Sequence, residues 1–153
     1  MRAESVMWQK LRVYLLAAKL DPIRVENPIH PGTPDVNYLH GWIELKTIGC
    51  WPQRNDANVL LRWFTPQQRV FLYRRWRAAP GSTHLLLEVR DASQWLLFDG
   101  DYAARSVGRV PQHELEVNAR TVLTATRLAE LANFLLPSSR TDGTRVVERA
   151  DRL

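Results

Sequence analysis

The sequence predicts a single α/β domain, and three observations indicate this class. Its 153 residues are enough to bury one hydrophobic core. An apolar stripe near the N-terminus and a capped segment beginning at Thr65 indicate two helices. Between and after them, short alternating or apolar runs indicate strands. A hydrophobic content of 45% and a charged content of 24% are ordinary for a globular protein.

Two helices are expected in the first half of the chain. The first covers residues 4–19, because apolar residues at helical spacing form one stripe: Met7, Leu11, Tyr14, Leu15 and Ala18. The second covers residues 65–79. Thr65 is expected to cap it, Pro66 to occupy its first position, and Pro80-Gly81 to end it.

The remaining elements are short. Strands are expected at residues 23–27, 34–39, 42–47, 84–89 and 94–98. A short amphipathic helix is expected near Arg127 to Leu136. The polar stretch from Pro137 is expected to be a mobile tail. The expected domain therefore covers residues 1–136, and the tail covers residues 137–153.

The charge of the chain favours a polyanionic partner. The net charge is +5 and the pI is about 9.9. Lys10, Lys19 and Lys46 are the only lysines among 21 basic residues, which leaves 18 arginines. Arginine suits bidentate contact with phosphate, although a GC-rich genome also enriches it.

Composition excludes several other classes of protein. Cys50 is the sole cysteine, so neither an intrachain disulfide nor a Cys-rich zinc site can form. The apolar run from Val13 to Ala18 is too short and too late for a signal peptide. No run approaches the length of a membrane span. We therefore expect a cytoplasmic protein without membrane association.

Residues 32–46 read Gly-Thr-Pro-Asp-Val-Asn-Tyr-Leu-His-Gly-Trp-Ile-Glu-Leu-Lys and are the most informative stretch. With His40-Gly41 as a two-residue turn, Asn37 opposes Glu44 and Asp35 opposes Lys46. The apolar residues then share one face: Val36, Tyr38, Ile43 and Leu45. The polar residues share the other face: Asp35, Asn37, Glu44 and Lys46. Two carboxylates beside an ammonium group can hold a divalent metal. The alternative is an edge hairpin with ordinary solvated charges, entered by a turn at Pro34-Asp35.

This hairpin resembles the PD-(D/E)xK nuclease superfamily, with Pro34-Asp35 as the first motif and Glu44-Leu45-Lys46 as the second. Gly32-Thr33-Pro34-Asp35 makes it most similar to small junction-resolving nucleases and the VRR-NUC group, many of them phage-encoded. The resemblance implies a restriction-endonuclease-like core of order αβββαβ with a mixed central sheet. In this chain a C-terminal strand and helix would follow that core.

The resemblance also implies a Mg²⁺-dependent DNA endonuclease, in which Mn²⁺ would substitute. Asp35 and Glu44 would ligate the metal together with the carbonyl of Leu45. Lys46 would position the attacking water or stabilise charge that develops on the phosphorane.

Two further positions have competing interpretations. In the resembled families a glutamate near the start of the first helix joins the metal site. Glu4 lies on the inward stripe, although a helix that begins at Ser5 would leave it outside, and Glu26 is the rival. Thr65-Pro66-Gln67-Gln68 matches a T/S-P-x-Q pattern of these families, which implies an active-site role for Gln68. Thr65 and Gln68 equally predict a capping box.

Arginines around the second helix are candidates for contacts with the DNA backbone: Arg62, Arg69, Arg74 and Arg77. A solvated helix face is the alternative. The resemblance implies branched DNA, such as a Holliday junction, cut by a homodimer in the cytoplasm of a bacterial host. Two alternatives are a nuclease for linear, flapped or specific duplex DNA, and an inactive nucleic-acid-binding protein on the same scaffold.

Overall fold

A mixed six-stranded sheet forms the centre of the computed structural model, which describes residues 3–136. Its strands lie in the order in which they occur in the chain: β1 (Ile23–Arg24), β2 (Val36–Tyr38), β3 (Gly41–Ile48), β4 (Thr83–Val89), β5 (Gln94–Asp99) and β6 (Thr121–Thr124). In this part of the chain β3 and β4 are the one parallel pair. The other neighbours are antiparallel.

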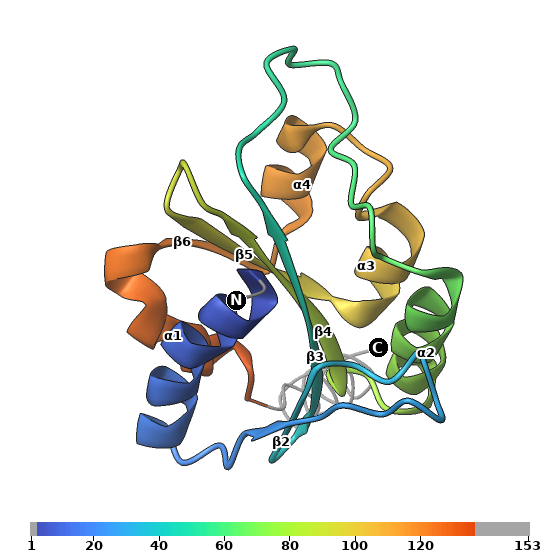
Figure 1. The fold of residues 1–153 in the computed structure, drawn as a ribbon, viewed down its shortest axis with the longest axis vertical. Helices are drawn as coiled ribbons and strands as arrows, with labels where there is room; N and C mark the ends of the chain where they lie inside the picture. The colour runs from blue at the N-terminus through green and yellow to red at the C-terminus, as the bar shows by residue number, and fades with distance from the viewer. Residues whose placement is uncertain (1–2, 137–153) are drawn as a thin grey trace, which may run out of the picture.

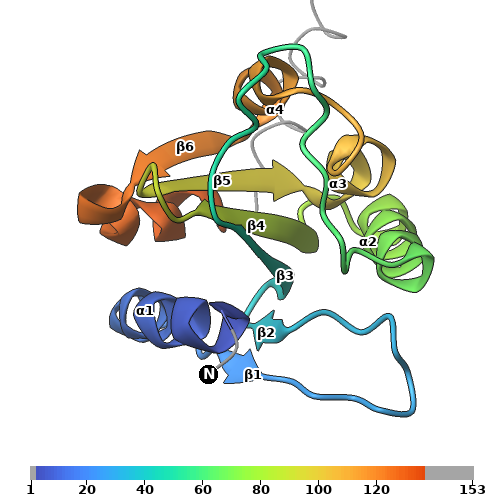
Figure 2. The same cartoon turned by 45° about the horizontal axis from the view of Figure 1, so that its top comes forward.

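Helices cover both faces of this sheet (Figures 1 and 2). The helices are α1 (Ala3–Ala17), α2 (Pro66–Ala78), α3 (Gly100–Ser106), α4 (Gln112–Asn118) and the 3₁₀ helix η1 (Ala125–Phe134). Helix α1 and η1 pack on one face, and α2, α3 and α4 lie on the other. The sheet is therefore the middle of three layers.

Each face of the sheet has its own hydrophobic core. On the α1 side, Met7, Leu11 and Leu15 pack against residues that include Ile43 and Leu86. On the α2 side the core includes Phe64, Leu72, Leu85, Leu87 and Phe98. Every residue of β4 is buried, as expected for a strand that is covered on both faces.

The predicted α/β class and mixed sheet are confirmed, and the first six elements follow the order helix, three strands, helix, strand. The start of α2 also agrees with the prediction, because Thr65 is its N-cap and forms a capping box with Gln68. Strand β1 is shorter than predicted and contains two residues. Within residues 3–136, no helix combines the length and the apolarity that crossing a membrane requires.

The predicted hairpin register is wrong by two residues. Val36 pairs with Ile43 and Tyr38 with Gly41, so Leu39 and His40 form the turn. The amide of Trp42 donates to the carbonyl of Ser82 at 2.9 Å, which recruits Gly41 into β3 instead of the turn.

The correct register has a useful consequence for the polar face of the hairpin. Side chains alternate with a period of two, so a shift of two residues leaves every side chain on its predicted face. Ile43 stays in the α1-side core, and Glu44 and Lys46 stay on the other face. If the observed register is extended by one residue, Asp35 lies opposite Glu44 instead of Lys46.

Three elements were not predicted: α3, α4 and β6. Neither Asp99 nor Pro111, the N-cap residues of α3 and α4, makes a side-chain capping hydrogen bond. These helices have seven residues each and are held by burial of Ala103 and Leu115 in the α2-side core. The predicted final helix is a 3₁₀ helix, Ala125–Phe134. The predicted tail, 137–153, lies outside the described residues.

Gly41 provides a test of the contact between β3 and the loop before β4. A Cβ atom at Gly41 would lie 2.0 Å from the carbonyl oxygen of Ser82, so the two backbones would have to separate. We expect Gly41→Ala to lower the free energy of unfolding by about 1–3 kcal/mol in urea denaturation. Gly49→Ala is the matched control, because its nearest new contact is the flexible end of Arg90 at 3.4 Å. Equal stability of the two variants would contradict this account of the turn.

Candidate functional site

A cavity of about 620 Å³ opens where the N-terminus of α1, β1, β3 and α2 meet. Its lining includes Ala3, Glu4, Ser5, Arg24, Glu26, Asp35, Glu44, Leu45, Lys46, Trp63 and Gln68. Every residue that the sequence nominated for catalysis or metal binding is in this set. These residues come from distant parts of the chain, and the fold brings them to one place.

Strand β3 presents Glu44 and Lys46 to the cavity. The side chains of Ile43 and Leu45 point to the opposite face and are buried in the α1-side core. Glu44 is 1% exposed and Lys46 is 6% exposed, so β3 holds both ionisable groups within the protein. Because the Leu45 side chain lies in the core, its backbone is the part of the residue that can face the cavity.

The two oxygens of the Glu44 carboxylate have different environments. Oε1 lies 3.3 Å from the ammonium of Lys46 and accepts a hydrogen bond of 3.1 Å from Nε2 of Gln68. Oε2 is buried and has no hydrogen-bond partner among the described residues. A buried carboxylate oxygen without a partner is costly, so this atom marks a position that a bound cation would stabilise.

Asp35 lies just before β2 and is held by two groups. Its Oδ2 accepts a hydrogen bond of 2.9 Å from the amide of Leu45. Its Oδ1 forms an ion pair of 2.7 Å with Arg24, which also donates to the Asp35 carbonyl at 3.1 Å. Sequence reasoning missed this role of Arg24. The available signal was that Arg24 shares a strand face with Glu26, which also lines the cavity.

Lys46 is oriented by the loop that precedes α2. Its ammonium donates to the carbonyl oxygen of Trp63 at 3.0 Å and pairs with Glu44. The loop thus fixes the ammonium beside the Glu44 carboxylate. The Trp63 ring is 75% exposed at the rim of the cavity, while its backbone fixes the lysine.

Gln68 takes part in both of the interactions that the sequence suggested. Its amide oxygen accepts from the amide of Thr65 at 2.9 Å, and the Thr65 hydroxyl accepts from the Gln68 amide at 3.2 Å. The same side chain donates through Nε2 to Glu44. Because the capping box fixes the oxygen end of the amide, the nitrogen end is directed at the carboxylate.

Burial raises the pKa of Glu44 well above its ordinary value, and the nearby Asp35 carboxylate raises it further. The Lys46 ammonium opposes both effects but does not overcome them. Glu44 therefore retains its proton at pH values where an exposed glutamate is ionised. A divalent cation at this carboxylate would displace the proton, so metal binding and proton release are coupled.

The donor set suits a metal ion that keeps much of its water. Within residues 3–136, no three or more His, Cys, Asp or Glu residues form a group that could hold a metal. Glu4, half-buried, and Glu26, exposed, both line the cavity without completing such a group. Asp35, Glu44 and the Leu45 backbone remain as the groups that could ligate a metal. This set fits Mg²⁺, which is commonly held by one or two carboxylates and several waters.

The predicted DNA-contacting arginines fall into two groups. Arg62, Arg74 and Arg77 are exposed. Arg69 instead donates to the carbonyls of Ala103 and Ala104 at 3.3 and 3.2 Å, and its guanidinium lies 4.1 Å from the centre of the Phe64 ring. Arg69 thus ties α2 to α3, a structural role that its sequence position did not reveal.

Comparison of the chain with protein-family models, curated proteins and solved structures finds no match. The resemblance in the hairpin motifs therefore remains a hypothesis. The proposal of function rests on the residues that line the cavity and on their contacts.

The buried carboxylate gives a prediction that needs no substrate. Between the ordinary pKa of 4.5 and the higher pKa in the folded protein, the folded state keeps a proton that the unfolded chain has lost. The free energy of unfolding should therefore fall as pH rises through this window. Glu44→Gln removes the effect, so in metal-free buffer it should melt above wild type at about pH 8, by roughly 2–4 °C for each kcal/mol gained.

The difference in melting temperature should disappear as pH falls below 4.5. Glu26→Gln is the control, because Glu26 lines the same cavity but is exposed. Its pH profile should follow that of wild type. A Glu44→Gln protein that is less stable than wild type throughout the alkaline range would refute the buried, proton-holding carboxylate.

Proposed function

We propose that this protein is a Mg²⁺-dependent endonuclease of the PD-(D/E)xK type that hydrolyses phosphodiester bonds in DNA. One observation carries the proposal. Glu44 has a buried carboxylate oxygen with no partner among residues 3–136, and both Asp35 and Lys46 adjoin this residue within an open cavity. Two carboxylates and an ammonium group on a basic protein are suited to metal-assisted hydrolysis of a polyanion.

The fold supports this proposal. The order helix, three strands, helix, strand and the mixed sheet are compatible with the core that the motifs imply. A binding protein on an inactive scaffold is the less favoured alternative. The buried Glu44 and Lys46 and the adjoining Asp35 favour the nuclease, because a scaffold that only binds DNA does not need a carboxylate oxygen buried without a described partner.

Each residue of the site has a role in the proposed reaction. Asp35, Glu44 and the Leu45 carbonyl would hold Mg²⁺, which polarises the phosphate and lowers the pKa of a bound water. Lys46 presents a positive charge where negative charge develops on the phosphate. Gln68 occupies Oε1 of Glu44 and leaves Oε2 for the cation. Glu4 or Glu26 would complete the shell through bound water.

Cleavage of DNA in Mg²⁺ tests the proposal directly. We expect Asp35→Asn and Glu44→Gln to lose cleavage, because each keeps the side-chain shape and removes a ligand charge. Lys46→Ala should lower turnover by at least about a hundredfold while DNA binding persists. Calorimetric titration should show weakened Mg²⁺ binding in the carboxylate variants. Mn²⁺ should support cutting, whereas Ca²⁺ should support binding with little cutting.

The matched control for these variants is Glu116→Gln on α4, whose side chain is exposed and contacts Gln112. It should cut DNA like wild type. Undiminished cleavage by purified Asp35→Asn or Glu44→Gln would refute the proposed metal site. Normal turnover by Lys46→Ala would show that this lysine is only a structural partner of Glu44.

For the substrate we propose branched DNA cut by a homodimer, a proposal that rests on the resemblance of Gly32-Thr33-Pro34-Asp35 and Glu44-Leu45-Lys46 to junction-resolving nucleases. A four-way junction should therefore be bound more tightly than a duplex of equal length, with two protomers on each junction. Cleavage of junction, flap and duplex substrates, together with light scattering, checks this. If the protein is a monomer both free and on the junction, the proposal of a junction resolvase is refuted, but the proposal of a nuclease is not.

A further inference from the structure

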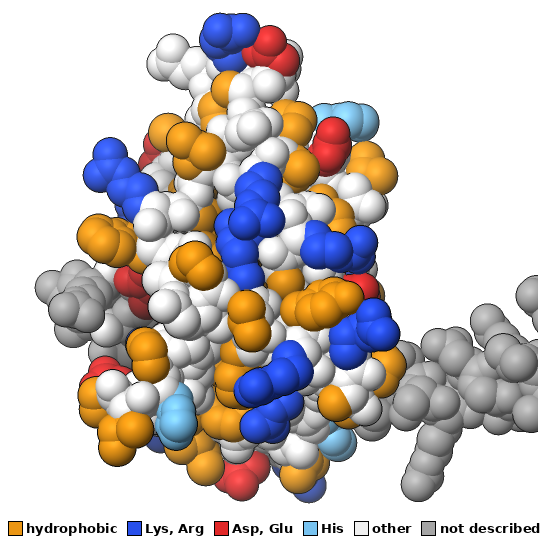
Figure 3. Space-filling view, turned by 90° about the vertical axis from the view of Figure 1, so that its right-hand side faces the viewer, with side chains coloured by type: hydrophobic (Ala, Val, Ile, Leu, Met, Phe, Trp, Pro, Cys, Tyr) orange, Lys and Arg blue, Asp and Glu red, His pale blue; other side chains and the backbone are white. Residues whose placement is uncertain are grey.

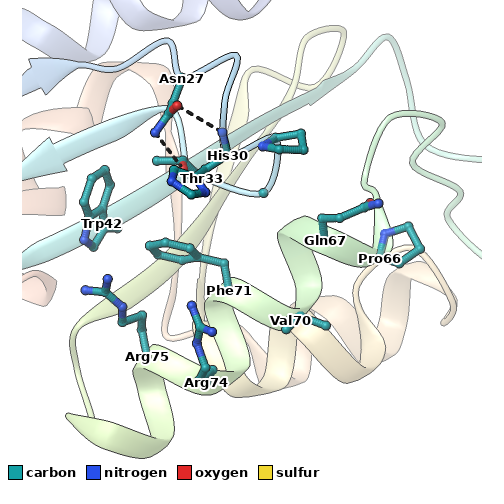
Figure 4. Close-up of a pocket in the computed structure, with 12 residues that line it drawn as sticks. Asn27, His30, Thr33, Trp42, Pro66, Gln67, Val70, Phe71, Arg74 and Arg75 are labelled. Carbon is teal, nitrogen blue, oxygen red and sulfur yellow. Dashed lines mark hydrogen bonds between the residues drawn. The ribbon is translucent and has the colours of Figure 1, made fainter.

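A second cavity, of about 630 Å³, lies between α2 and the segment that joins β1 to β2 (Figure 4). Two aromatic rings form part of its wall. Trp42 from β3 and Phe71 from α2 meet edge to face, with centroids 5.6 Å apart. Both are only half-buried. We name this cavity the Trp42–Phe71 pocket.

The opposite wall of the Trp42–Phe71 pocket is held in shape by Asn27. Its side-chain oxygen accepts hydrogen bonds from the amides of Ile29 and His30, both at 3.1 Å, and its amide nitrogen donates to Thr33 at 3.4 Å. Figure 4 shows Asn27 and Thr33 facing the aromatic rings across the pocket. The pocket is thus defined by fixed contacts on both sides.

The Trp42–Phe71 pocket adjoins the proposed catalytic cavity. Trp42 and Glu44 point to the same face of β3 and are two residues apart, which is about 6.6 Å along a strand. On α2, Gln67 lines the aromatic pocket and Gln68 lines the catalytic cavity. A chain bound at Glu44 could therefore place its neighbouring unit against Trp42 and Phe71.

Charge around the Trp42–Phe71 pocket favours an anion. Among residues 3–136 no acidic residue lines the pocket, whereas Arg74 and Arg75 line it and are exposed. The Arg75 guanidinium lies 5.0 Å from the centre of the Phe71 ring. An adjoining groove on α2 is lined by further arginines, among them Arg105 and Arg109, and no acidic residue of the described part of the chain lines it. Figure 3 shows basic side chains interleaved with apolar ones on this side of the molecule.

We propose that the Trp42–Phe71 pocket binds one unpaired nucleotide of the DNA substrate, with its base against the two rings and its phosphate against Arg74 and Arg75. Aromatic rings stack on any base, and arginines contact the backbone, so the site would not depend on sequence. A base within an intact duplex is already stacked and must be extruded before it can enter. This inference rests on the proposed nuclease function and adds that the nucleotide beside the cut is unpaired or, at the branch point of a junction, extruded.

The test measures binding in metal-free buffer, where cleavage does not interfere. A labelled duplex with one central unpaired nucleotide is compared with a fully paired duplex of equal length. Wild type should bind the first more tightly by roughly fivefold to 150-fold. Replacing the unpaired nucleotide by an abasic one should remove this preference without any change to the protein.

Protein variants then locate the effect. Phe71→Leu keeps an apolar side chain and should abolish the preference for the unpaired nucleotide. Arg74→Gln combined with Arg75→Gln should weaken binding to both duplexes and reduce its dependence on salt. The matched control is Arg12→Gln, exposed on α1 on the other side of the sheet, which should bind like wild type.

Three outcomes of the DNA-binding measurements would overturn the proposal: equal binding of the two duplexes, a preference that survives the abasic substitution, or a preference that survives Phe71→Leu. Phe71-dependent dimerisation without DNA would instead assign the pocket to a second copy of this chain and would also overturn it. The nuclease proposal is tested separately. If the protein shows the predicted binding but does not cleave DNA in Mg²⁺, only the nuclease proposal is refuted. If it cleaves DNA but does not show the predicted binding, only the proposed role of the pocket is refuted.

Discussion

The alternation of side chains along β3 is the constraint on which the site depends. Ile43 and Leu45 supply the core beneath α1, while Glu44 and Lys46 face the cavity on the other side. A slip of one residue would exchange these sets and place two charges under α1. The apolar packing of α1 therefore holds the polar face in register, although α1 contacts Glu44 through no described hydrogen bond.

Burial of Glu44 has a cost that the surrounding contacts only partly offset. Lys46 and Gln68 stabilise one carboxylate oxygen, and the other has no described partner. An unsatisfied buried group persists only where the rest of the fold is stable enough to hold it. Here the cost has a use, because the carboxylate is held in place, and a cation at Oε2 would displace a proton without breaking a described contact with another protein group.

Helix α2 links the parts of the molecule that matter for function. Its first turn is capped by the same Gln68 that contacts Glu44, so the start of the helix and the shape of the site are set together. Leu72 anchors the helix in the α2-side core, and Arg69 ties it to α3. Because these inward contacts fix the helix, its exposed Arg74 and Arg75 are held in place beside the Trp42–Phe71 pocket.

Local sequence is sufficient to predict the features that depend on residues close together in the chain. The capping box spans four residues, and the separation of apolar from polar side chains in the hairpin follows from strand alternation alone. Tertiary structure alone decided the hairpin turn, because it depends on the contact of Trp42 with Ser82. It also decided the pairing of Arg24 with Asp35 and the burial of a Glu44 oxygen that has no described partner. Helices α3 and α4 also depend on tertiary structure, because burial against other elements holds them. The energy of such contacts cannot be read from a local stretch of sequence.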